Sequence, residues 1–165
     1  MSQSTLCGRD LSLLVGPDSP FSRVEYIDYD DGPTSGAVQC RSRLETYRFE
    51  LLDRDSEGKY DRQAWDQGQE IRIFALSVLP LPSFLRLVDI LGRPESRKRM
   101  AEDATYFDEV HSILGAADRR ELVIATHGIR TPIIAARGVI DADIASVQDW
   151  FGFLGLTPQT EGPHQ

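Results

Sequence analysis

The chain is poor in cysteine and has no long apolar run. It contains two cysteines in 165 residues, and its longest apolar stretch, residues 73–85, is interrupted by two prolines and two serines. A stretch of this length and composition is too short to span a bilayer. No basic segment followed by an apolar run opens the chain, so we expect no signal peptide, no membrane partner and a cytoplasmic location.

The two cysteines, Cys7 and Cys40, are too few for the disulfide framework on which small secreted domains depend. We expect Cys7 in a flexible segment and Cys40 in a strand as a small buried hydrophobic residue, both in a reducing compartment. Together with three scattered histidines they cannot supply the four closely spaced ligands of a structural zinc site. The sequence therefore predicts no metal.

Motifs for nucleotide binding and nucleophilic catalysis are missing as well. Neither Gly-x-Gly-x-x-Gly nor Gly-x-x-x-x-Gly-Lys-Ser/Thr occurs, and there is no Gly-x-Ser-x-Gly elbow. The sequence therefore predicts no cofactor, and it favours a binding protein over an enzyme.

Positive charge is scarce, because 18 basic residues face 26 acidic ones and the net charge is −8. A negative field repels phosphate backbones, so a nucleic-acid partner is not expected. The single basic run, residues 93–99, is expected on the solvent-facing side of a helix that also carries glutamates. This charge balance favours a basic protein as the partner.

What is present indicates one ordinary domain. Hydrophobic residues make up 41% and charged residues 27% of the chain, close to the usage of globular proteins. A single core suits this length. We expect a flexible N-terminal arm over residues 1–22, one domain over residues 23–156 and a polar tail over residues 157–165.

Six segments carry the signal of β-strands. Alternation is clearest at residues 44–52, where Tyr47, Phe49 and Leu51 share one face. The segment 71–79 is apolar on both faces, as in a central strand. Turn-like segments separate the strands, which favours an antiparallel meander. The remaining strands are expected at residues 24–29, from residue 36, at 121–126 and at 132–140, the last two joined by a turn at 127–130.

Three segments have the periodicity of helices. One is expected at residues 83–91 and ends at Gly92 as a left-handed residue, a longer one at 94–115, and a third begins after a cap at Asp141 and ends at Gly155. Residues 53–68 are polar and are expected to form a long loop. The sequence thus predicts an α+β fold, with a mainly antiparallel sheet of five to six strands and about three helices packed against it.

The acidic residues Glu25, Asp28, Asp30 and Asp31 form the first candidate site. Alternation places Asp28 and Asp30 on one face, where carboxylates can bind a divalent cation or share a proton. Asp-Asp-Gly-Pro is also the sequence of an ordinary turn, and no calcium-loop spacing is present. We favour the turn, with carboxylates free to meet arginines of a partner.

His127 is the second candidate, because a histidine followed by glycine in a turn is accessible and titrates near neutral pH. Arg130 lies three residues further on. The alternative function is therefore a small enzyme in which Asp28, Asp30 and His127 converge at one end of the sheet, with or without a metal.

The leading hypothesis is a small acidic protein-binding domain, of the kind represented by inhibitors and immunity proteins that neutralise a basic partner. Charge complementarity would speed the encounter and aromatic residues would supply the contact. A homodimer is a further alternative, because Trp150, Phe151 and Phe153 crowd one short helix. The residues expected to bind the partner are Glu25, Tyr26, Asp28, Tyr29, Asp30, Asp31, Tyr60 and Trp65.

Overall fold

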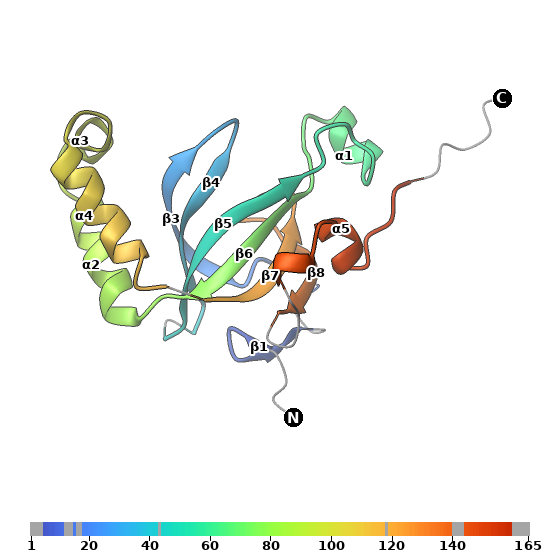
Figure 1. Cartoon of the computed structure of the whole chain (residues 1–165), viewed down its shortest axis with the longest axis horizontal. Helices are drawn as coiled ribbons and strands as arrows, with labels where there is room; N and C mark the ends of the chain where they lie inside the picture. The colour runs from blue at the N-terminus through green and yellow to red at the C-terminus, as the bar shows by residue number, and fades with distance from the viewer. Residues whose placement is uncertain are drawn as a thin grey trace.

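Six antiparallel strands form the main sheet, and they follow one another in chain order (Figure 1). The computed structural model describes residues 5–11, 15, 18–42, 44–117, 119–139 and 144–159. The predicted α+β class and the antiparallel meander are confirmed. The strands are β3 (Phe21–Tyr29), β4 (Pro33–Cys40), β5 (Thr46–Arg54), β6 (Arg72–Val78), β7 (Arg120–Thr126) and β8 (Ile133–Gly138).

The strand pattern follows from the alternation of side chains. On β5, Tyr47 and Phe49 are buried on one face of the sheet, and the Phe49 ring meets Phe74 of β6 edge to face at 5.5 Å. On β6 both faces are buried from Arg72 to Ser77, as the apolar sequence predicts for a central strand. Gly36 is required on β4, because a Cβ there would lie 2.1 Å from the Glu25 carbonyl oxygen.

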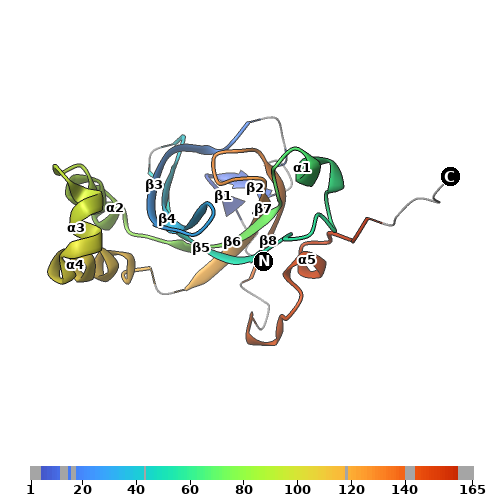
Figure 2. The ribbon, with the colours of Figure 1, turned by 90° about the horizontal axis from the view of Figure 1, so that it is seen from above.

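The sheet is strongly curved, and its concave face holds the largest core. Seen from above, the strands wrap around the hairpin of β1 (Thr5–Leu6) and β2 (Arg9–Asp10) (Figure 2). Leu6 is fully buried against side chains of β3 to β8. The turn between β7 and β8 adds Ile129 to the same core. The concave face is therefore covered by segments of the chain that lie outside the strands.

Three helices lie beside β3 and β4, on the other face of the sheet. They are α2 (Leu81–Leu91), α3 (Ser96–Glu102) and α4 (Ala104–Leu114), all inserted between β6 and β7 (Figure 1). Their apolar sides pack on Ala37 of β4 and Ile27 of β3. The helical layer thus stands next to the edge of the sheet that β3 forms.

The prediction of a single helix over residues 94–115 is wrong, because the helix is interrupted at Asp103. Asp103 has an extended conformation, and its side chain accepts the backbone N–H groups of Thr105 and Tyr106, so it caps α4 and ends α3. Gly92 also differs from the prediction, since it ends α2 with a φ of −80° and is not left-handed.

Two further predictions need correction outside the helical layer. The polar loop 53–68 contains a short helix, α1 (Arg62–Asp66), that is capped by Asp61. The expected C-terminal helix is reduced to a 3-10 turn, η2 (Ile144–Ser146), and to α5 (Trp150–Phe153), which is capped by Asp149. The cap predicted at Asp141 lies outside the described residues.

The aromatic residues of α5 are packed within the chain. Trp150 and Phe151 are buried with β6, β7 and Leu156 on the convex face, and the guanidinium of Arg137 lies 4.4 Å from the Phe153 ring centre. The crowding that suggested a homodimer is therefore accommodated inside one chain. The homodimer itself stays a prediction.

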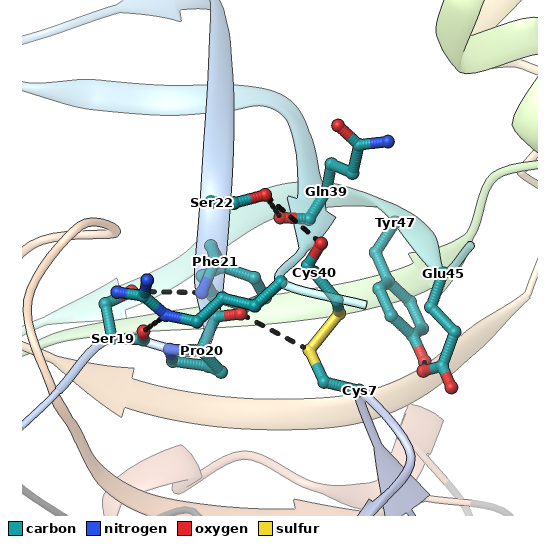
Figure 3. The surroundings of a disulfide bond; sticks show 10 residues. Cys7, Ser19, Pro20, Phe21, Ser22, Gln39, Cys40, Glu45 and Tyr47 are labelled. Atoms are coloured by element: carbon teal, nitrogen blue, oxygen red, sulfur yellow. Dashed lines mark hydrogen bonds between the residues drawn. A yellow bond between two sulfur atoms is a disulfide. The ribbon is translucent and has the colours of Figure 1, made fainter. Parts of the chain in front are cut away.

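The expectation of unpaired cysteines is wrong. Cys7, directly after β1, forms a disulfide with Cys40 at the end of β4, with an S–S distance of 2.00 Å (Figure 3). The segment before residue 23, expected to be an arm, therefore contributes Leu6 to the core and Cys7 to a covalent link. Spacing in the sequence could not show this pairing, because it depends on how the hairpin enters the curved sheet.

The disulfide lies among well-bonded neighbours (Figure 3). The Pro20 carbonyl oxygen is 3.8 Å from Cys7 Sγ, which is a contact and not a hydrogen bond because a disulfide sulfur has no proton to donate. Ser22 Oγ donates to the Cys40 carbonyl at 3.1 Å, and the Arg41 guanidinium donates to the Ser19 carbonyl at 3.0 Å. These bonds fix the start of β3 against the end of β4.

Breaking this disulfide is expected to lower the free energy of unfolding by about 3 to 4 kcal/mol, because the bond restricts the unfolded chain across a separation of 33 residues. Guanidinium unfolding with and without a reductant measures the change. The Cys7→Ser/Cys40→Ala variant should show the same loss and no response to the reductant. An unchanged unfolding midpoint of the natural chain after reduction would contradict the prediction.

Candidate functional site

A groove of about 400 Å³ runs along the edge strand β3. One wall is formed by β3 itself from Val24 to Tyr29. The opposite wall is formed by the end of α2, by α3 and by Phe107 of α4, and Arg130 of the β7–β8 turn closes one part of the lining. Four of the residues predicted to bind a partner line this groove.

The groove exposes aromatic and apolar surface. Tyr29 is 64% exposed and Phe107 is 40% exposed, whereas most large apolar residues of the chain are buried. The rings of Tyr26 and Tyr29 meet edge to face at 6.2 Å, and Phe107 stacks on His111 at 3.9 Å. Rings that are held in place by neighbours and still face solvent are suited to contact a partner at low entropic cost.

The charged side chains of the β3 wall are acidic, and each already has a partner within the chain. Glu25 accepts from the guanidinium of Arg23 at 2.8 Å. Asp28 Oδ2 accepts from the Ser35 hydroxyl at 2.6 Å and lies 3.5 Å from Nε2 of His111. The Asp28 side chain remains 48% exposed, so it can take a further donor from outside.

Two basic side chains also line the groove, one on the helical wall and one against β3. Arg97 of α3 lines the groove, and Arg130 donates to the Tyr26 hydroxyl at 2.9 Å with its guanidinium 5.7 Å from the Tyr26 ring centre. The lining thus holds two carboxylates and two guanidinium groups. The formal charges of the lining therefore balance, and the net charge of −8 does not concentrate inside the groove.

A second hollow, of about 490 Å³, lies at the end of the sheet where α1 is placed. It is lined by Asp31 of the β3–β4 turn, Trp65 of α1 and His127 of the β7–β8 turn. Trp65 rests directly on Gly58, whose φ is +70° and where a Cβ would lie 2.6 Å from Trp65 Cγ. The indole is therefore held in place while 37% of the residue stays exposed.

His127 is paired with Asp61 at the rim of this hollow. His127 Nε2 lies 2.8 Å from Asp61 Oδ2. Because an ionised carboxylate can only accept, Nε2 carries a proton and donates a hydrogen bond to Asp61. Three influences act on the pKa of Asp61, and the net result is a value below the ordinary 3.8. The backbone N–H of Ala64 lowers it most, partial burial opposes this, and His127 lowers it further.

The loop before α1 is organised by Asp55, which was not among the residues singled out from the sequence. Asp55 is 3% exposed and accepts backbone N–H groups from Lys59, Tyr60 and Asp61 at 2.7 to 3.1 Å. Such a carboxylate substitutes for regular secondary structure by satisfying the loop backbone. The preference of aspartate for turns was the available signal, but it did not single out Asp55 among its acidic neighbours.

The structure divides the predicted site residues between two places. Glu25, Tyr26, Asp28 and Tyr29 share the β3 groove. Asp31, Trp65 and His127 share the second hollow. Asp30 is exposed in the β3–β4 turn, and Tyr60 stacks on Phe151 at 3.9 Å, outside both hollows.

The proposed convergence of Asp28, Asp30 and His127 finds no support in this arrangement. Asp28 is bonded to Ser35 beside His111, whereas His127 is bonded to Asp61 in the other hollow. In the described part of the chain no group of three or more histidine, cysteine, aspartate or glutamate residues could hold a metal ion.

None of the helices in the described ranges is long and apolar enough to cross a membrane. Comparisons of the chain with models of protein families, with curated proteins and with solved structures found no match.

Replacing Asp61 tests its role as a helix cap. Asp61→Ala is expected to lower the free energy of unfolding by about 1 kcal/mol at neutral pH, because the Ala64 N–H loses its acceptor. Asp61→Asn keeps an acceptor and isolates the contribution of the charge. Urea unfolding of the three proteins measures both effects.

The difference in the free energy of unfolding between the natural chain and Asp61→Asn should also depend on pH in a definite direction. Because folding lowers the pKa of Asp61, the extra stability of the natural chain over Asp61→Asn is present above pH 3.8 and is lost as the pH falls through the folded-state pKa. A difference that grows on acidification would contradict this assignment.

Proposed function

We propose that the chain is a protein-binding domain and that the β3 groove is its binding site. The observation that carries the proposal is that four predicted contact residues of one edge strand line a groove whose opposite wall is helical. Two exposed aromatic rings, Tyr29 and Phe107, lie at this site. Aromatic side chains in a partly enclosed groove are the usual source of binding energy in protein interfaces.

The charge of the chain supports a basic partner. A net charge of −8 attracts a basic protein over a distance of about 8 to 10 Å at physiological ionic strength and raises the rate of encounter. An inhibitor or immunity-type protein, which must reach its target quickly, uses this kind of attraction. Contact residues in the groove then determine how long the complex lasts.

The cytoplasmic location suggested by the sequence is not part of the proposal. It rested on the expectation of no signal peptide and on unpaired cysteines, and the bond between Cys7 and Cys40 removes the second of these premises. Structural disulfides form and persist in oxidising compartments and are rare in the cytosol. We place the site of action in an oxidising environment.

Filling the groove tests the proposed function. Ala101 is exposed on α3 and lines the groove, so Ala101→Trp should obstruct it without disturbing the core. Ala104, exposed at the start of α4 and outside the lining, gives a matched control in Ala104→Trp. The natural chain and Ala104→Trp should capture the same proteins from a lysate of the source cells. The amount of these proteins captured by Ala101→Trp should be at least tenfold lower.

Recovery of the same proteins in the same amounts by all three baits would show that the groove is not the binding site. Circular dichroism and thermal unfolding verify that both variants fold. Raising the salt concentration should weaken the capture, because the attraction of a basic partner to this chain is screened.

A further inference from the structure

The strand β3 forms an edge of the sheet, and among the described residues no strand pairs with its outer side. It pairs with β4 on one side, and the Val24 carbonyl faces the other way, where Arg130 Nη2 approaches it at 3.5 Å. The guanidinium of Arg130 therefore already takes up one backbone acceptor of β3. An edge with unsatisfied backbone groups is a template for a further strand.

The dimensions of the groove suit an extended segment. Six consecutive residues of β3 line it, so at about 3.3 Å per residue the edge is at most about 17 to 20 Å long, and irregular pairing with β4 on both sides of Asp28 interrupts it. A neighbouring strand would lie about 4.8 Å away in the hydrogen-bonding direction, between β3 and the wall that α3 and Phe107 form. Figure 1 shows the helical layer standing beside this edge of the sheet.

The chemistry of the walls indicates what the segment must carry. Cross-strand neighbours of opposite charge stabilise a pair of strands, so a basic side chain is favoured beside Glu25 or Asp28. Met100 and Phe107 offer apolar surface to the alternate side chains. Arg97 on the far wall disfavours a uniformly basic segment and leaves a place for one acidic residue or a terminal carboxylate.

We propose that the partner contributes an extended segment, basic on the side facing β3 and apolar at alternate positions, that adds to β3 as a seventh strand of the sheet. This inference rests on the proposed protein-binding function and specifies how that function is carried out. Main-chain hydrogen bonds to β3 provide the affinity, and the alternating side chains provide the selectivity.

A second copy of the chain is the competing occupant of the same edge. Pairing of β3 with β3 of another molecule would bring together two chains of net charge −8 and would place like carboxylates opposite one another. Charge complementarity therefore favours a basic segment of a different protein.

Selection from a displayed library of random decapeptides tests the proposal, with Ala101→Trp as the counter-selection bait and Ala104→Trp as the control. Peptides that bind in a groove-dependent way should be enriched in arginine, lysine and β-branched residues and depleted in proline. Groove-dependent peptides that are acidic or helix-forming would overturn strand addition while leaving the protein-binding function standing. Absence of any groove-dependent enrichment would count against both.

Backbone methylation of one selected peptide distinguishes strand addition from simple charge attraction. N-methylation at alternate positions removes the N–H donors that face β3 and should weaken binding at least tenfold, whereas methylation at the intervening positions should change it less than threefold. Equal effects at all positions would overturn the proposal. Sedimentation of the free chain from about 1 to 100 µM should give a monomer, and a dimer abolished by Ala101→Trp would assign the edge to a second copy instead.

Discussion

Covering the concave face of the curved sheet is the requirement on which the rest of the structure depends. Residues of all six strands turn apolar side chains to this face, and a curved sheet that does not close into a barrel needs other segments to cover its inner surface. The β1–β2 hairpin supplies Leu6 and the β7–β8 turn supplies Ile129. Burying one such side chain contributes about 1.5 to 3 kcal/mol. The covalent link between Cys7 and Cys40 holds the hairpin in this position.

The same covering segments determine which part of the sheet stays accessible. The β7–β8 turn reaches across the concave face, and Arg130 contacts Tyr26 and the Val24 carbonyl of β3, the strand at the opposite edge. At the other end of β3, the buried Arg72 of β6 donates to the carbonyls of Asp31 and Pro33 and pairs with Glu70. Arg72 thus fixes the turn of the β3–β4 hairpin and Arg130 fixes the middle of β3, and among the described residues no strand pairs with the outer side of β3.

The sequence predicted what depends on neighbours along the chain and missed what depends on distant contacts. Alternation at Tyr47 and Phe49 identified β5 because the period of a strand is local. The break at Asp103 was overlooked because apolar periodicity continues through it, and a capping side chain overrides that periodicity. The pair of Asp61 and His127 joins residues 66 positions apart, so neither spacing nor composition could reveal it.

The position of the helices explains why the edge of the sheet is a groove and not a bare strand. Helices α2 to α4 connect β6 to β7, which are neighbours in the middle of the sheet, yet they pack beside β3 and β4. An isolated edge would risk unspecific pairing with any exposed strand. The wall that carries Arg97 and Phe107 narrows the approach to this edge, and in the proposed binding mode it would select a segment with matching side chains. The insertion of helices therefore places a wall beside an edge strand that would otherwise be bare.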